Sequence, residues 1–68
     1  MTLDQLVADA VAEAHGLGHK GAMVALKAAV QADPSGAQAK AGSYSQAVLN
    51  KDHIARASLA ALNEALNG

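Results

Sequence analysis

Side chains suited to molecular recognition are concentrated between residues 42 and 52. This stretch holds the only aromatic residue of the chain, and hydroxyl and amide groups surround it: Ser43, Tyr44, Ser45, Gln46 and Asn50. Amide side chains can pair with adenine and hydroxyls accept several bases, while lysines neutralise backbone phosphates. The lysines that we assign to phosphate contacts are Lys20, Lys40 and Lys51. The pattern therefore predicts a DNA-binding segment over residues 35–51.

No arrangement of residues indicates catalysis. Hydroxyl, carboxyl and imidazole groups do occur close together, in Ser43, Ser45, Asp52 and His53. Their spacing does not suggest a nucleophile with a base and an orienting acid. A domain of 68 residues also lacks room for a substrate pocket of ~300 Å³ or more. We therefore expect no enzymatic activity and no small-molecule substrate.

A G-x-G-x-x-G pattern, formed by Gly16, Gly18 and Gly21, invites comparison with nucleotide-binding loops. In dinucleotide-binding folds this pattern follows a strand and opens a helix. Here it follows a predicted helix, and the chain is too short for the rest of such a fold. We expect a corner between two helices and no cofactor. As an alternative, free amides at the start of the second helix, beside His19 and Lys20, can hold a phosphate oxygen.

Metal sites, disulfides and membrane segments are not expected either. His15 and His19 are four residues apart, but the glycines between them break the helical spacing that chelation needs. The chain has no cysteine, which is typical of intracellular proteins. Its start, T-L-D-Q, lacks the basic residues of a signal peptide, and no apolar run approaches the ~20 residues that span a bilayer. The sequence therefore predicts a cytoplasmic protein.

The elements that position these side chains are all predicted to be helices, because no stretch alternates apolar and polar residues as a strand does. The first helix covers residues 3–14, where apolar residues follow the spacing of one buried stripe. Thr2 and Gln5 form a capping box at its start. Gly16 ends it, because glycine accepts the left-handed conformation at a helix terminus.

Two further helices follow from the same kind of signal. One covers residues 20–32 and stops before Pro34, which disfavours the helical conformation in the preceding residue. The last helix covers residues 52–66, and its inner face is expected to consist of Ile54, Ser58, Leu59, Leu62, Ala65 and Leu66. A chain of 68 residues forms one domain. Residues 1–68 are therefore predicted to be a single all-α domain, a compact bundle of four to five short helices.

The middle of the chain is predicted to contain two short helices. Two Ser-x-x-Gln pairs, which start at Ser35 and Ser43, can each cap a helix. Gly42 separates the pairs, which predicts helices over residues 35–41 and 44–50 with a break at the glycine. Two short helices that meet at a glycine are the sequence outline of a helix-turn-helix.

Residues 34–66 resemble the helix-turn-helix region of small bacterial and phage repressors, of the Cro type and the lac-repressor-headpiece type. The residues that match the recognition helix of these repressors are Ser45, Gln46, Val48, Leu49 and Asn50. The later run A-S-L-A-A-L-N-E-A-L resembles the closing helix of such domains. The resemblance implies a transcriptional regulator whose second helix, from Tyr44 to Asn50, enters a groove of DNA.

The charge distribution fits this interpretation. The net charge is −1, but the first 13 residues contain three acidic residues and no basic one, whereas residues 14–51 contain four lysines and one acidic residue. Such asymmetry fits a basic binding face backed by an acidic face. The same charge distribution is also explained by solvated charges that are scattered over helix surfaces and have no common function.

An interaction module is the competing prediction. Apolar residues make up 51% of the chain, but Phe and Trp are absent, so a small core of alanine and leucine gains stability from a partner. Leu59, Leu62 and Leu66 form a short seam that can dock against a partner helix or a second copy in a homodimer. Two functions therefore stay open: a DNA-binding helix-turn-helix protein, and a non-enzymatic helical adaptor or oligomerisation module.

Overall fold

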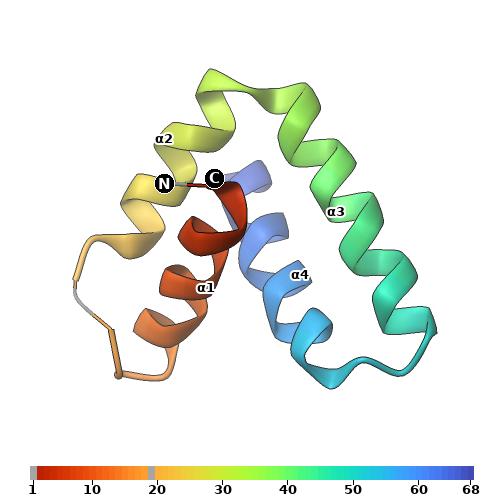
Figure 1. Ribbon diagram of the computed structural model, residues 1–68. Helices are drawn as coiled ribbons and strands as arrows, with labels where there is room; N and C mark the ends of the chain where they lie inside the picture. Colours follow the sequence, from red (N-terminus) through yellow and green to blue (C-terminus); the bar gives the residue numbers. More distant parts are fainter. Residues whose placement is uncertain (1, 19) are drawn as a thin grey trace.

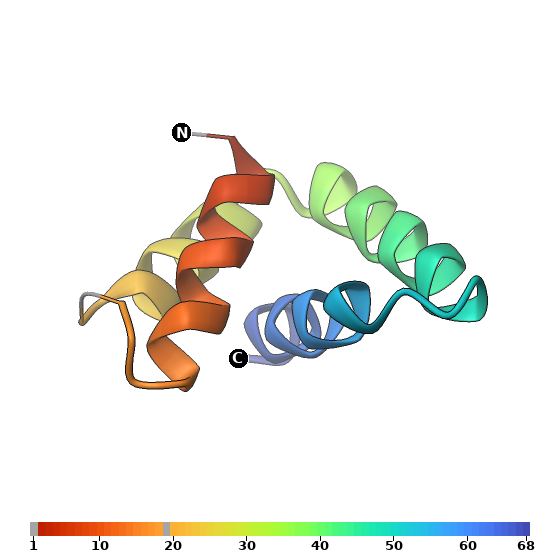
Figure 2. The same ribbon diagram turned by 60° about the horizontal axis from the view of Figure 1, so that its bottom comes forward.

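Four helices make up the part of the chain that the computed structural model describes, residues 2–18 and 20–68. They are α1 (Leu3–Ala14), α2 (Ala22–Ala32), α3 (Pro34–Leu49) and α4 (His53–Asn67). Figure 1 shows two helical hairpins, α1 with α2 and α3 with α4, and α4 packs against each of the other three helices. Figure 2 shows α4 between the α1–α2 hairpin and α3. The predicted all-α architecture is confirmed, and α4 is its central element.

Helices α1 and α4 begin where their capping residues predict. The Thr2 hydroxyl accepts the Gln5 amide N–H at 3.2 Å, and the Gln5 side chain accepts the Thr2 amide in return. At α4, the Asp52 carboxylate accepts two amides of the first turn at 3.0 and 3.2 Å. Gly16 adopts the left-handed conformation just after α1, with a φ of 75°. None of the described helices is both long enough and apolar enough to cross a bilayer.

Helix α3 is one continuous helix, so the predicted break at Gly42 is wrong. Its backbone runs without interruption from Pro34 to Leu49, as Figure 1 shows. The helices predicted over residues 35–41 and 44–50 are therefore two parts of one rod. A helix-turn-helix that turns at Gly42 is not present.

Helix α3 continues because it buries the same face on both sides of the glycine. Ala37, Ala41 and Tyr44 follow one another at spacings of four and three residues, and all three pack against the core. A glycine inside a helix costs ~1 kcal/mol relative to alanine. Breaking the helix at Gly42 would instead separate Tyr44 from the stripe that it shares with Ala37 and Ala41.

The capping signals in this segment have other partners. The N-cap of α3 is Asp33, whose carboxylate accepts the Gly36 amide at 3.0 Å, and Pro34 follows at the first helical position. The Ser43 hydroxyl donates to the carbonyl of Ala39, one turn back, at 3.4 Å. Ser43 therefore bonds within the helix rather than capping a new one.

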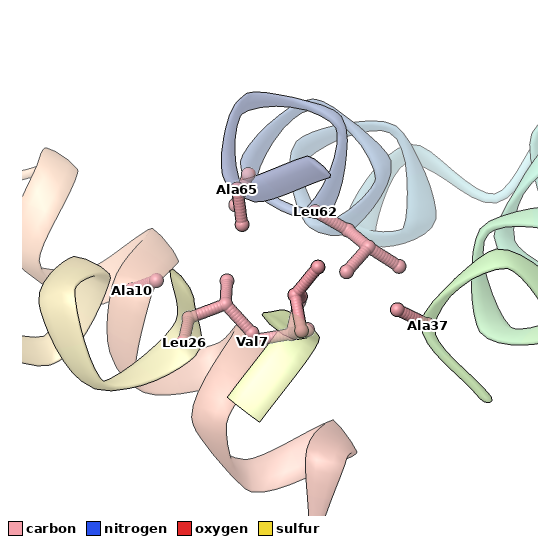
Figure 3. Close-up of a cluster of buried hydrophobic side chains, with 8 residues drawn as sticks. Val7, Ala10, Leu26, Ala37, Leu62 and Ala65 are labelled. Atoms are coloured by element: carbon pink, nitrogen blue, oxygen red, sulfur yellow. The ribbon is translucent and has the colours of Figure 1, made fainter. Parts of the chain in front are cut away.

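The core lies where α1, α2 and α4 meet, and α3 closes one side of it. Figure 3 shows the side chains that point into this space. Leu26 and Leu62 have no exposed surface, and Val7 is 1% exposed. The other members of the cluster are small: Ala10, Val30, Ala37, Ala61 and Ala65. Small side chains let the helices approach closely, but each contact buries little apolar area.

One prediction about the inner face of α4 is wrong. Ile54 was expected there, yet 80% of it is exposed, and Ala55 is the buried residue of this first turn instead. Leu62 is fully buried and Leu66 packs against the same core. Leu62 and Leu66 therefore belong to the inner face, as predicted, and are not free to form the docking seam that was the alternative.

Candidate functional site

The polar residues predicted to read DNA lie on a helix whose outer face carries no charge. Ser43, Ser45, Gln46 and Asn50 are all exposed to solvent on α3 or directly after it. The other exposed residues of α3 are also uncharged: Pro34, Ser35, Gln38, Ala39, Gly42 and Leu49. The face therefore offers hydrogen-bonding groups without phosphate anchors among them.

Lys40 and Tyr44, two other predicted DNA contacts, are bound to Asp4 in the first turn of α1. The Tyr44 hydroxyl donates to Asp4 Oδ1 at 2.8 Å. Lys40 Nζ lies 3.1 Å from Oδ1 and donates to Oδ2 at 3.2 Å. The hydrogen bond from Tyr44 and then that from Lys40 lower the pKa of Asp4. Burial, followed by the bond to Asp4, raises the pKa of Tyr44 to about 12. These contacts tie α3 to α1.

The other two lysines that were predicted to contact phosphates, Lys20 and Lys51, are far from each other. Lys20 belongs to the linker between α1 and α2, and Lys51 belongs to the turn between α3 and α4. Figures 1 and 2 show these two connections on opposite sides of the molecule. Lys51 also adopts a φ of 67°, the left-handed conformation, at that turn. The lysines predicted to anchor phosphates therefore do not meet on one surface.

The amides at the start of α2 are already occupied by a carboxylate of the chain. Glu13 accepts the Gly21 amide N–H at 2.7 Å through Oε2 and the Met23 amide N–H at 2.9 Å through Oε1. A negative charge at this position also interacts favourably with the helix dipole. Two of the amides expected to hold a phosphate oxygen are thus taken by Glu13, and His19, named for the same role, lies outside the described residues.

An open apolar groove lies between α1, α2 and α4. Its volume is about 210 Å³, and it is lined by Val11, Ala14, His15, Met23, Ala57, Ala60, Ala61 and Glu64. Alanine supplies most of the wall on α4, which keeps the groove wide at that side. A second hollow of about 180 Å³ is lined by Leu3, Leu6, Ala29 and Asp33. The first groove differs from it by drawing its walls from three helices.

The polar groups of the groove are His15 and Glu64. His15 Nδ1 lies 2.9 Å from the carbonyl oxygen of Val11. Because a carbonyl only accepts, Nδ1 carries the proton in this contact. Among the described residues, no group of three or more His, Asp or Glu side chains is placed to hold a metal ion. The groove is therefore suited to contact with apolar side chains, and His15 and Glu64 are its polar groups.

This groove was not among the sites predicted from the sequence. Ala57, Ala61 and Glu64 are separated by four and three residues, so the sequence does place them on one face of α4. The hollow itself depends on how α1 and α2 cross that face. Short-range spacing contains no information on the crossing of helices that lie far apart in the chain.

No protein-family model, curated protein or solved structure matches the chain.

Proposed function

We propose that the domain is a non-enzymatic helical interaction module that binds a helix of a protein partner along the groove between α1, α2 and α4. The observation that carries the proposal is the groove itself, an open space of about 210 Å³ with mainly apolar walls. An amphipathic helix that docks in an apolar groove is a common form of protein recognition. The scattered lysines favour this function over binding to DNA.

The size of the groove suits one or two large apolar side chains. A closed cavity of ~150 Å³ lined by apolar residues takes up benzene. The groove is larger at about 210 Å³, and it is open to solvent along one side. Complete burial of one large apolar side chain of the partner would contribute ~1.5–3 kcal/mol. Alanine at the groove wall also lets a partner backbone approach closely.

A selection of helical peptides tests the proposal. Peptides from a random helical library that bind this domain are expected to carry apolar residues at i, i+3 or i+4, and i+7. Their binding should shift the NMR resonances of Val11, Met23 and Ala57. The variant Ala14→Glu should lose this binding, because Ala14 lines the groove and is exposed, so the charge enters the site without entering the core.

The matched control is Ala28→Glu, which places the same residue at an exposed position of α2 outside the groove. It should bind the selected peptides like the unchanged domain. Peptides that bind α3, or that bind Ala14→Glu as well as the unchanged domain, would argue against the groove.

Titration with labelled duplex DNA at low salt tests the competing function. The interaction module predicts no change in anisotropy at ~10 µM protein, a concentration within the range of ~1–100 µM at which even nonspecific DNA binding is detected. Binding that weakens steeply with salt and disappears in Lys51→Glu would instead support DNA recognition. Lys51 is the informative site, because it is exposed and is not bound to Asp4 as Lys40 is.

A further inference from the structure

Helix α4 exposes a polar stripe to solvent, and one edge of the stripe borders the groove between α1, α2 and α4. It consists of His53, Arg56, Ala60, Asn63, Glu64 and Asn67, all exposed to solvent. Arg56, Ala60 and Glu64 follow one another at intervals of four residues, so they form one ridge along the helix. Within residues 2–18 and 20–68, neither Arg56 nor Glu64 makes an ion pair.

We propose that a second copy of this chain binds this stripe, through an antiparallel contact between the two α4 helices about a two-fold axis at Ala60. The contact goes beyond the proposed function, because the stripe has no large apolar side chain to fill the groove. Ala60 and Glu64 belong to both surfaces. A two-fold axis is the commonest symmetry of soluble homo-oligomers, and it brings the same patch of both copies together.

The charges of the stripe are complementary to themselves in this arrangement. Arg56 and Glu64 lie at equal distances in sequence on either side of Ala60. An antiparallel pair centred on Ala60 therefore places Arg56 of each copy beside Glu64 of the other, twice. The same symmetry places His53 opposite Asn67, which can accept or donate a hydrogen bond. A parallel pair would instead face Arg56 with Arg56 and Glu64 with Glu64.

The ridge geometry also suits this pairing. Helices most often pack with their i±4 ridges interdigitated, at a crossing angle of about −50°. In that class the ridge from Arg56 to Glu64 lies alongside its symmetry mate. Alanine at the crossing point lets the two backbones approach, and the longer charged side chains meet beyond it. Since α4 has 15 residues, the contact is short, and a weak, reversible dimer is expected.

Sedimentation equilibrium with charge-reversal variants tests the inference. The weight-average mass of the unchanged chain should rise with concentration from 6.8 kDa towards twice that value. Arg56→Glu and Glu64→Arg should each weaken association about tenfold or more, because two attractions become two repulsions. An equimolar mixture of the two variants should associate again, since each reversed charge then meets its opposite. Both positions are exposed, and circular dichroism checks that the variants are folded.

The double variant Gln38→Glu and Gln46→Glu is the control for net charge. It changes the charge by the same amount as Arg56→Glu, but on the exposed face of α3, and it should associate like the unchanged chain. A constant mass of 6.8 kDa at every concentration would overturn the inference. Association that ignores both single variants, or a mixture that stays monomeric, would overturn it as well. The loss of peptide binding in Ala14→Glu is measured in a separate assay. A chain that stays monomeric would therefore overturn the dimer without deciding whether the groove binds a helix.

Discussion

At the scale of single residues, Glu13 connects two helices that are adjacent in the chain. Its carboxylate accepts two amides at the start of α2, at 2.7 and 2.9 Å. Because Gly21, at the N-cap, has no side chain to do this, the carboxylate acts as a cap supplied from α1. Helix capping of this kind contributes ~1 kcal/mol.

We therefore expect Glu13→Gln to lower the free energy of unfolding by ~1 kcal/mol, because the charge at the helix N-terminus is lost while the side chain keeps its length. Urea denaturation followed by circular dichroism measures the change. Asp9→Asn is the control, since Asp9 is also a carboxylate of α1 and its side chain caps no described helix. Equal stability of the two variants would show that Glu13 does not cap α2.

Tyr44 reports on its own contact with Asp4, because it is the only tyrosine of the chain. Burial, and then the hydrogen bond to Asp4, raises its pKa to about 12, against ~10 in an unfolded chain. A raised pKa means that the folded state holds the proton more tightly. The stabilisation is thus complete below pH ~10 and is lost as the pH rises towards the folded value.

The absorbance of tyrosinate should accordingly titrate at a pH of about 12 in the native protein and near ~10 in denaturant. Asp4→Asn should lower the native midpoint only in part, because burial is the larger cause. A native midpoint equal to the denatured one would show that the Tyr44 hydroxyl is not bound to Asp4.

At the scale of elements, the continuity of α3 makes Gly42 an ordinary interior position of a helix. A Cβ at Gly42 would meet no atom within 4 Å. Gly42→Ala should therefore raise the free energy of unfolding by ~1 kcal/mol, since alanine is the better helix former. Thermal or urea denaturation checks this. A destabilised variant would support a turn at Gly42.

Gly21→Ala is the matched comparison. Its Cβ would also meet no atom within 4 Å, but Gly21 has a φ of 96°. An L-residue is strained in that conformation, so the substitution should destabilise the domain by ~1 kcal/mol. Both sites have room for a Cβ, but only Gly21 has a positive φ, so opposite signs are expected.

The sequence predicted α1, α2 and α4 because their signals are local and agree with one another. Capping residues, a proline and a glycine set their ends within a residue or two of the observed bounds. In α3 the local signals at Ser43 and Gly42 pointed to a break, while the stripe of Ala37, Ala41 and Tyr44 pointed to continuity. Burial of a shared face outweighed a glycine in the helix, and only the tertiary contacts reveal that balance.

At the scale of the whole molecule, few large side chains hold the core together. Leu62 and Leu26 have no exposed surface, and the other buried residues of the cluster are all valine or alanine. Leu62→Ala should therefore lower the free energy of unfolding by ~3 kcal/mol through lost burial and the cavity that remains. That loss is a large fraction of the stability of a domain this small.

Leu49→Ala provides the comparison on the surface. Leu49 is 74% exposed, so its truncation should change the free energy of unfolding by at most ~0.5 kcal/mol. Chemical denaturation of both variants measures the difference. Similar stabilities would mean that Leu62 does not occupy the centre of the core.

The candidate site depends on how several helices are arranged in space, which is why it was not predicted from the sequence. The groove takes its walls from residues that lie as far apart in the chain as Val11, Met23 and Ala61. Helices α1, α2 and α4 were predicted, but the mutual angles of the helices were not, because many small side chains permit several close packings. The sequence contains the charged residues Arg56 and Glu64 of α4. Only the structure shows that both are exposed.

Helix α4 follows the other three in the chain, yet it contacts each of them. During synthesis, the α1–α2 hairpin and α3 emerge from the ribosome before the helix that covers their apolar sides. A nascent chain that ends before residue 53 lacks the α4 side of the core, so Val7, Leu26 and Val30 have only part of their final burial. The complete core can form only after α4 has been translated, because Leu62, one of its two fully buried leucines, belongs to that helix.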